Sequence, residues 1–202
     1  MTTSMGDQAT TDARADQPAD GSSGQHPAIR RVVETYGDRQ LSMSLFRGQS
    51  TLIVEPADAH EVLRFLREDP ACDCNMLVDV TAVDYLGYPV EQPGRFAVVW
   101  VLRSHAHDQL LLMKTFLNPT IETSGIEPDP GLEVDSACDI WPGAEWRERE
   151  VYDMFGIRFK GHPDLRRILT WRDFPAHPLR KDYPLRGRGE RENYSVTERD
   201  SV

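Results

Sequence analysis

The sequence predicts an α+β domain of two layers, in which two helices cover one face of a largely antiparallel sheet, followed by a short helix and an extended C-terminal arm. Three observations predict this class. Segments with alternating apolar residues outnumber segments with helical spacing, and together they give the order α-β-β-α-β-β-β. With 39% apolar residues, the 202-residue chain can build one core of ordinary size. Beyond residue 140 the composition changes to proline, arginine and aromatic residues, so the domain is expected to end there.

Turn-forming residues divide the first 70 residues into four elements. Apolar residues at helical spacing precede Gly37, and glycine favours the left-handed conformation at a helix end. Leu41, Met43 and Leu45 alternate with serines, as in a half-buried strand. Pro56 suits the first turn of a helix, where its missing N–H costs nothing. The expected elements are a helix over residues 26–36, strands over residues 41–46 and 50–55 with a turn at residues 47–49, and a helix over residues 56–69.

Three further strands are expected before the composition changes. Met76, Val78 and Val80 alternate with other residues, and two later segments carry the longest apolar runs of the chain. These runs have the length of strands and fall far short of the roughly 20 residues that span a bilayer. The expected strands cover residues 75–85, 95–103 and 109–117, with a connection at residues 87–94 and a loop rich in proline, glycine and acidic residues at 118–135.

A short helix over residues 145–155 is expected to open the C-terminal part. Glu145, Arg149 and Asp153 lie four residues apart, so opposite charges alternate along one stripe and predict ion pairs between successive turns. Gly156 is expected to end this helix.

The arm after this helix is expected to be mostly extended. Residues 157–160 alternate as in a short strand, and Pro163 can begin a single turn over residues 164–169. Each later proline of the arm forces the preceding residue away from helical geometry. Such a segment has little core of its own, so we expect it to lie on another surface.

The charge of this part of the chain differs from that of the remainder. From Trp146 to Arg191 twelve Arg or Lys face seven Asp or Glu, whereas the whole chain has a net charge of −10. Only three of the 23 cations are lysines. Arginine and aromatic residues are enriched at protein interfaces, and arginine pairs with carboxylates in a planar, bidentate way. The composition therefore favours an interface.

Cysteine and histidine do not predict a metal centre. The pair Cys72 and Cys74 and one distant cysteine are too few for a disulfide framework or for a four-thiolate iron–sulfur cluster. Adding His60, His105 or His107 gives no recognised zinc spacing. We expect the cysteines to be small apolar side chains in a reducing compartment and the chain to hold no metal.

Carboxylates and histidines of the arm do not predict catalysis. Glu148 and Glu150 could form an acid–base pair, but alternating charges on a helix are more typical of structural ion pairs. His162 and His177 each precede a proline, which indicates turns. We therefore expect no catalytic, cofactor-binding or metal-ligating residue here.

Other classes of function are weakly supported. Asp79, Asp84 and Tyr85 on one strand could suggest a hydrolytic centre, but no nucleophile elbow accompanies them, so a sheet-edge or interface role is favoured. Residues 187–191 lack the ending of a phosphate-binding loop. Arginine mixed with aromatic residues is also a signal of nucleic-acid binding. A pI near 5.0 and the acidic residues within the arm argue against that class.

The N-terminal residues differ from both parts. They are rich in Thr, Ser, Asp, Ala, Gln and Gly, contain no aromatic residue and lack the basic start and apolar run of a signal peptide. Four regions are thus expected: a disordered tail over residues 1–25, the α+β domain over residues 26–140, a helix plus extended interface arm over residues 141–191, and a flexible C-terminus over residues 192–202.

Several long strings of residues carry a resemblance to a known family. They are Glu148-Arg149-Glu150, Asp153-Met154-Phe155-Gly156-Ile157, Gly161-His162-Pro163-Asp164-Leu165-Arg166-Arg167-Ile168-Leu169, His177-Pro178-Leu179-Arg180-Lys181-Asp182-Tyr183-Pro184-Leu185, Asp79-Val80-Thr81-Ala82-Val83-Asp84-Tyr85 and Asp139-Ile140-Trp141-Pro142-Gly143-Ala144. Together they closely resemble the signature of the C subunit of respiratory complex I, the proton-translocating NADH:quinone oxidoreductase. The resemblance covers roughly residues 28–186 and is specific, because the strings occur in the same order. The chain departs from the pattern at residues 170–176, where a turn containing Tyr-Gly is usual, and at Cys138, where a hydroxyl residue is usual.

The resemblance implies a non-redox structural subunit with a mixed sheet, in the peripheral arm of an enzyme that passes electrons from NADH through FMN and iron–sulfur clusters to quinone and translocates protons. It implies packing beside the D subunit of complex I, near the B and I subunits, on the cytoplasmic face of the inner membrane, which the chain reaches only through the complex. FMN and the clusters would belong to other subunits. An equivalent subunit of a membrane-bound hydrogenase or formate hydrogenlyase is the alternative.

The same resemblance, together with the charge pattern, selects the residues expected at the interface with partner subunits. They are Glu148, Arg149, Glu150, Asp153, His162, Asp164, Arg166, Arg167, His177, Arg180, Lys181, Asp182 and Tyr183.

Overall fold

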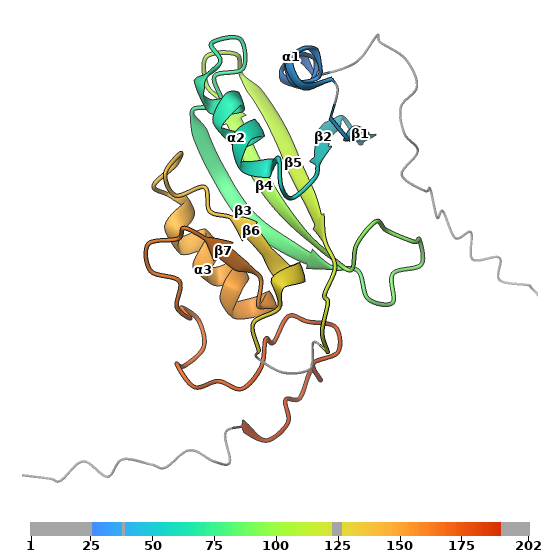
Figure 1. The fold of residues 1–202 in the computed structure, drawn as a ribbon, viewed down its shortest axis with the longest axis vertical. Helices are drawn as coiled ribbons and strands as arrows, with labels where there is room; N and C mark the ends of the chain where they lie inside the picture. The colour runs from blue at the N-terminus through green and yellow to red at the C-terminus, as the bar shows by residue number, and fades with distance from the viewer. Residues whose placement is uncertain (1–25, 38, 123–126, 191–202) are drawn as a thin grey trace, which may run out of the picture.

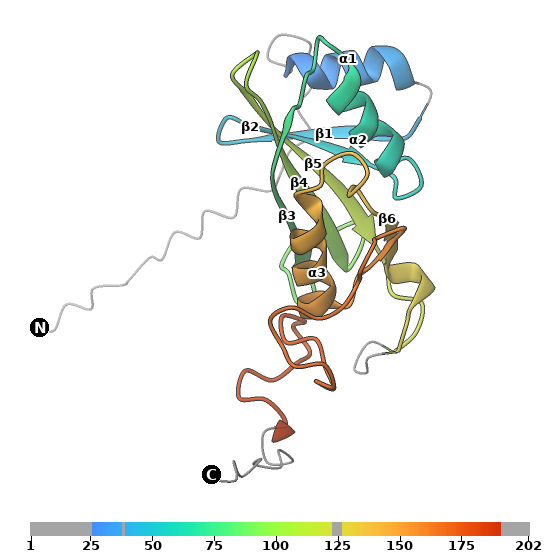
Figure 2. The same cartoon turned by 90° about the vertical axis from the view of Figure 1, so that its left-hand side faces the viewer.

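A computed structural model describes residues 26–190 of the chain, except residue 38 and residues 123–126. One five-stranded sheet forms the centre of the domain, in the order β1-β2-β5-β4-β3, and the helices α1 and α2 lie on one side of it (Figures 1 and 2). The elements of this domain are α1 (Pro27–Tyr36), β1 (Leu41–Phe46), β2 (Gln49–Val54), α2 (Ala59–Glu68), β3 (Met76–Asp84), β4 (Phe96–Ser104) and β5 (Gln109–Leu117).

Strand pairing makes the sheet mixed and mostly antiparallel. β1 pairs with β2, β3 with β4 and β4 with β5 in antiparallel fashion, whereas β2 and β5 run parallel. The β1–β2 hairpin closes through Arg47 and Gly48, both with positive φ, as a two-residue turn between twisted strands favours. The α+β class with a largely antiparallel sheet is confirmed.

The core lies between this sheet and the helices. Alternate residues of the central strands, including Trp100 on β4 and Met113 on β5, are fully buried, and so are Leu63 and Leu66 of α2. Burying such side chains stabilises the fold by about 1.5–3 kcal/mol each. Intervening residues of β2 and β5 are only half-buried, so the opposite face of the sheet is more open.

A second, two-stranded sheet was not predicted. The chain forms a short 3₁₀ helix, η1 (Pro130–Leu132), and then β6 (Glu133–Asp135), within the segment expected to be a loop. β6 pairs in parallel with β7 (Arg158–Lys160). The prediction of a loop up to residue 135 was wrong at its end, because the partner strand that makes residues 133–135 extended lies more than twenty residues away in sequence.

The helix α3 (Ala144–Phe155) packs on β3 and places Val151, Met154 and Phe155 in the core. Gly156 ends it with φ 75°, in the left-handed conformation that glycine adopts readily. Both features agree with the sequence, and so do the elements of the domain to within three residues at their ends.

Two boundaries differ from expectation. The second helix begins at Ala59, after a turn that contains Pro56, and not at Pro56 itself. Residues 164–169 do not form the expected helical turn: residue 164 lies in a turn, residues 165–167 are irregular and residues 168–169 are bends. The backbone N–H groups of Ile168 and Leu169 bond to a side chain described below. The expected tail over residues 1–25 and the C-terminus over residues 192–202 lie outside the described residues. Within the described part of the chain, no helix is both long and apolar enough to cross a bilayer.

Candidate functional site

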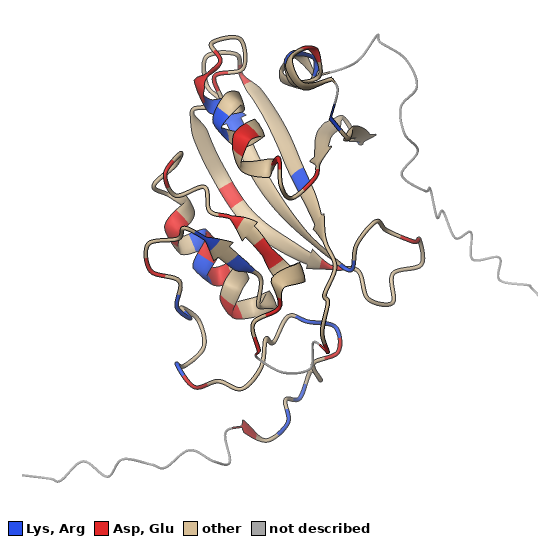
Figure 3. Ribbon diagram, viewed as in Figure 1, with Lys and Arg blue, Asp and Glu red and all other residues tan. Residues whose placement is uncertain are grey.

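The arm folds back on α3 and the end of β3 (Figure 3), and ion pairs join residues there that are far apart in sequence, such as Arg95 and Asp182. The turn at Gly156 reverses the chain direction, and the backbone N–H of Leu179 donates to the carbonyl of Met154. The arm therefore has contacts with its own domain, in addition to any surface that a partner offers.

Asp153 is the principal attachment point of the arm. Its side chain is completely buried and accepts hydrogen bonds from the backbone N–H groups of Ile168, Leu169 and Thr170 at 3.0, 2.7 and 2.8 Å. The Thr170 hydroxyl and the Arg167 guanidinium also donate to it, the latter at 2.7 Å. Burial alone would raise the pKa of Asp153, but these donors lower it below its ordinary value. The carboxylate is thus held ionised in the interior.

This arrangement corrects the expected charge stripe on α3. Arg149 does not pair with Asp153; it donates instead to the carbonyls of Arg166 and Arg167, at 3.1 and 3.2 Å. Arg167 is the ion-pair partner of Asp153, with only 9% of its side chain exposed. Helical spacing predicts pairs on an exposed surface, and here the surface is covered by the arm.

A second attachment lies at His177 and Arg180. The His177 ring donates from Nδ1 to the carbonyl of Asp153 at 2.9 Å, and Arg180 donates from Nε to the carbonyl of Phe155 at 2.6 Å. Both side chains are buried. Burial lowers the pKa of His177 to about 4, so the ring is neutral near pH 7. A Cβ on Gly156 would lie 2.3 Å from Arg180 Nη2, so this close approach also requires glycine.

A third attachment joins the arm to the sheet. The buried Asp84 at the end of β3 accepts from Arg95 Nε and Nη2 at 3.1 and 3.0 Å and from the backbone N–H of Lys181 at 2.8 Å. Arg95 also pairs with Asp182 at 2.8 Å. Burial alone would raise the pKa of Asp84, but these donors lower it.

Glu148 has a structural role that differs from the expected ion pair. Its side chain is fully buried and accepts from the Ser136 hydroxyl at 2.6 Å, from the Ala137 N–H at 2.7 Å and from the Cys138 thiol at 3.5 Å. Burial raises its pKa despite these donors. Glu148 therefore fixes the segment before α3, and no cation forms an ion pair with it in the described part of the chain.

Cys138, Glu148 and His162 bring their ligand atoms within 4.8 Å of one another, a spacing that a metal ion could bridge. Both ring nitrogens of His162 are already used: Nδ1 accepts from the N–H of Asp164 at 3.0 Å, and Nε2 donates to the carbonyl of Glu145 at 2.9 Å. Burial raises the pKa of the Cys138 thiol to about 12. The donor set fits a neutral hydrogen-bond network better than a metal site, which needs a free imidazole nitrogen and a thiolate.

Arginines border a cavity of about 610 Å³ between α3 and the arm. Arg149, Arg166, Arg167 and Arg172 line it together with Tyr152 and Leu165, and no carboxylate is among the lining residues. Arg172 is exposed, and the one ion pair of Arg166 among the described residues is an exposed pair with Asp164. The cavity can therefore receive anionic groups from outside the chain.

The predicted interface residues fall into three sets. The buried ones form hydrogen bonds within the chain, the half-buried ones lie at the margin, and the exposed ones lie on the surface, where Asp182 also pairs with Arg95. They are, in that order, Glu148, Asp153, His177 and Arg180; Arg149, His162, Arg167 and Tyr183; and Glu150, Asp164, Arg166, Lys181 and Asp182. Contact with a partner stays a prediction for every one of them.

Sequence reasoning missed the participation of Arg95 and Ser136 in these attachments. Both lie in the α+β domain rather than in the arm, and neither belongs to a motif that pointed to charge pairing. Asp84 was singled out only for a sheet-edge or interface role. The sequence offered one signal for Asp84, which is that it lies in the string of residues 79–85 that resembles the family.

Comparison with protein families gives one match, to a family described as respiratory-chain NADH dehydrogenase, 30 kDa subunit, over residues 52–189. Among similar proteins, the C subunit of NADH-quinone oxidoreductase from Methylobacterium radiotolerans is 39% identical over 85% of this chain and 73% of that protein. The corresponding protein of Geobacter metallireducens is 42% identical over 83% of this chain and 93% of its own length. The Rhodopseudomonas palustris protein of the same name is 44% identical, and the aligned region spans 65% of it.

Two solved structures share the fold. A trypsin-resistant fragment of Nqo5 matches with a TM-score of 0.54 and 28% identity, over 68% of this chain and 99% of the fragment. A chain of the membrane-bound sulfane sulfur reductase, an archaeal respiratory membrane complex, matches with a TM-score of 0.59 over 86% of this chain and 94% of that one. At 20% identity, this second likeness concerns the fold alone.

Proposed function

The chain belongs to the family of the respiratory-chain NADH dehydrogenase 30 kDa subunit, and from this membership we propose that it is a structural subunit whose arm positions its neighbours in an NADH-quinone oxidoreductase complex. The chain would carry no redox group itself. FMN and iron–sulfur clusters would belong to other subunits and pass electrons from NADH to quinone, coupled to proton translocation. Because electron tunnelling depends steeply on distance, a rigid scaffold would contribute to turnover without a catalytic residue.

The division of charge on the arm carries this proposal. Buried carboxylates such as Asp153 and Asp84 are satisfied inside the chain, whereas the arginine-lined cavity opens outward and has no carboxylate in its lining. Arginines placed around a recess suit the carboxylates of another subunit.

Apolar side chains on the same part of the chain support an interface. Trp146 is 67% exposed, and three leucines of the arm are also exposed. Monomeric proteins expose single apolar residues freely, but aromatic anchors beside arginines are typical of protein–protein contacts. The exposed leucines are Leu169, Leu179 and Leu185.

We propose the D subunit of complex I as the principal partner, with the B and I subunits nearby, on the cytoplasmic face of the inner membrane. The chain would reach the membrane only through the complex. The relatives of 39–44% identity, all named as C subunits of NADH-quinone oxidoreductase, favour this complex over a hydrogenase-type assembly.

Charge reversal in the arginine-lined cavity tests the proposal. Arg172→Glu and Arg166→Glu change exposed side chains and leave Asp153 and its donors intact. A desolvated pair at an interface loses about 2–5 kcal/mol on such a change, whereas an exposed pair loses about 0–1 kcal/mol. We expect less assembled complex in native gels of membranes, with a normal rate of quinone reduction per assembled complex.

Arg30→Glu on the exposed side of α1 is the matched control and should leave assembly unchanged. Full assembly of the Arg172→Glu and Arg166→Glu complexes with abolished quinone reduction would contradict the proposal, since the arm would then act on the reaction itself.

The absence of a redox group has its own test. The purified chain is incubated with ferrous iron, sulfide and FMN, desalted, and analysed for metal and flavin. We expect neither at a stoichiometric level and no oxidation of NADH. Stoichiometric iron or flavin would overturn this part of the proposal.

A further inference from the structure

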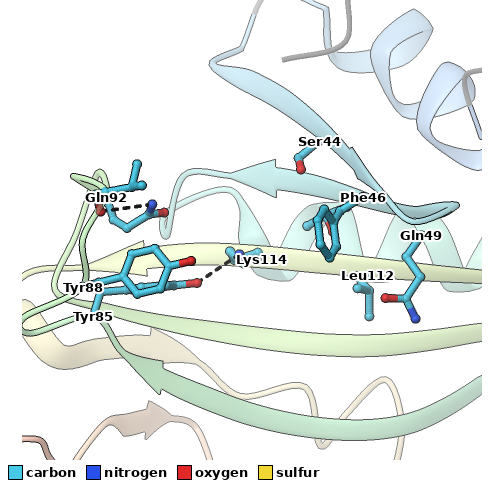
Figure 4. Close-up of a pocket in the computed structure, with 10 residues that line it drawn as sticks. Ser44, Phe46, Gln49, Tyr85, Tyr88, Gln92, Leu112 and Lys114 are labelled. Carbon is cyan, nitrogen blue, oxygen red and sulfur yellow. Dashed lines mark hydrogen bonds between the residues drawn. The ribbon is translucent and has the colours of Figure 1, made fainter. Parts of the chain in front are cut away.

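The face of the sheet opposite α1 and α2 carries a groove of about 280 Å³ (Figure 4). Leu112 and Lys114 of β5 form its floor, the end of the β1–β2 hairpin borders one side, and the connection after β3 borders the other. This groove shares no lining residue with the arginine-lined cavity of the arm.

The strand pattern explains why this face is open. Met113 and Leu52 point into the core, so their neighbours Leu112, Lys114 and Thr51 point to the other face and are only half-buried. Among the described residues, α1 and α2 lie on the far side of the sheet and α3 packs on β3, and no helix or strand lies over this groove (Figures 1 and 2).

Lys114 gives the groove a charge that the described part of the chain does not balance. Its ammonium group donates to the Tyr85 hydroxyl at 3.2 Å and lies 5.7 and 5.5 Å from the centroids of the Tyr85 and Phe116 rings. No ion pair of Lys114 with a described carboxylate exists, and no acidic residue lines the groove. Unlike Arg149, which donates to two backbone carbonyls, Lys114 has only a hydroxyl and aromatic rings as its partners among the described residues.

The walls of the groove are apolar and aromatic, with a few hydrogen-bonding groups. Phe46 is 51% exposed and Tyr88 is 56% exposed. The amides of Gln49 and Gln92 line the groove as well, and side chains of this kind can bond to an extended backbone. Such a lining suits a peptide segment better than a small polar ion.

We propose that this groove docks a segment of another subunit of the complex, in which an Asp or Glu side chain pairs with Lys114 and apolar neighbours pack on Phe46 and Tyr88. That the partner is a subunit of the complex rests on the proposed function, whereas the expected side chains of its segment follow from the residues that line the groove. A second copy of this chain fits less well, because a two-fold contact sets the same patch against itself and would oppose Lys114 with Lys114.

Photo-crosslinking in the assembled complex tests the inference. A benzoylphenylalanine placed at the exposed Gln49 reports what lies in the groove, and mass spectrometry identifies the attached peptide. We expect one adduct with another subunit, through a peptide that contains Asp or Glu. Lys114→Glu should reduce the adduct yield about tenfold, and Lys114→Arg should retain it.

Arg166→Glu in the same background separates this inference from the proposed function. If the arm is not an interface, assembly stays normal and the groove adduct persists, which refutes only the proposed role of the arm. An adduct with this chain itself, no adduct, or equal yields from Lys114→Glu and the unaltered protein would each overturn the docking groove.

Discussion

Asp153→Asn tests whether buried carboxylates hold the arm in place. Five donors surround the carboxylate: three consecutive backbone N–H groups, the Thr170 hydroxyl and the Arg167 guanidinium. Asparagine has nearly the same shape but replaces one accepting oxygen with an NH₂ group, so it cannot satisfy all five. The Thr170 hydroxyl can reorient and accept from the amide, whereas the guanidinium of Arg167 can only donate.

The expected loss follows from the burial of Arg167. Its side chain is 9% exposed and its carboxylate partner is completely buried, so the substitution leaves a largely desolvated cation without a counterion. Breaking a buried pair in this way costs about 3–5 kcal/mol. Asp164→Asn is the matched control, because Asp164 and Arg166 are 46% and 72% exposed, and such a pair contributes about 0–1 kcal/mol.

Amide hydrogen exchange at residues 168–170 measures the effect locally, and urea unfolding measures it globally. We expect exchange at these three amides to accelerate by about two to four orders of magnitude in Asp153→Asn, which corresponds to the loss above. If the arm detaches before the domain unfolds, the urea midpoint changes less than the exchange rates. Exchange within tenfold of the unaltered protein would refute the reasoning, since Asp153 would then not be what holds the arm.

Two further predictions concern the same attachments. The pKa of His177 is about 4 in the folded chain and about 6.5 when unfolded, so the unfolded state binds more protons between these two pH values. The free energy of unfolding should therefore fall by about 3 kcal/mol as the pH drops from 6.5 toward 4, and His177→Gln should flatten that part of a urea-unfolding pH series. Gly156→Ala and Gly161→Ala both place alanine at positive φ, but only the Cβ at residue 156 would meet Arg180. We expect the free energy of unfolding in urea to fall by about 1–3 kcal/mol more in Gly156→Ala than in Gly161→Ala, and equal losses would contradict the close approach.

The sequence predicted the domain well because its elements are local patterns. The strands over residues 41–46 and 109–117 agree with the structure at both ends, since alternation of apolar residues with period two fixes which face is buried. The pairing of β6 with β7 could not be predicted in the same way. It joins two three-residue segments with no alternation long enough to detect, and the whole of α3 lies between them in sequence.

The site was predicted less completely than the fold. The arm was recognised from its residue types, yet the spacing of Arg149 and Asp153 suggested a pair that does not form. Rules for residues four apart apply to exposed helix surfaces, and the sequence does not reveal that residues 168–170 cover this surface with their backbone N–H groups. The expected ion pair of Glu148 was wrong for the same reason, because the hydrogen-bond donors to this carboxylate come from residues before the helix.

The internal attachments and the outward arginines are linked through preorganisation. An arm without a helix or a core of its own would have to be ordered when a partner binds, and that ordering would reduce the affinity. Asp153, His177 and Asp84 order it in advance, since each fixes a different part of the arm to the domain. The carboxylates of Asp153 and Asp84 are also buried inside the chain, so no carboxylate lines the cavity that Arg166 and Arg172 border. Loss of an attachment should therefore weaken assembly by making the arm mobile, and loss of an outward arginine should weaken it while the arm stays ordered.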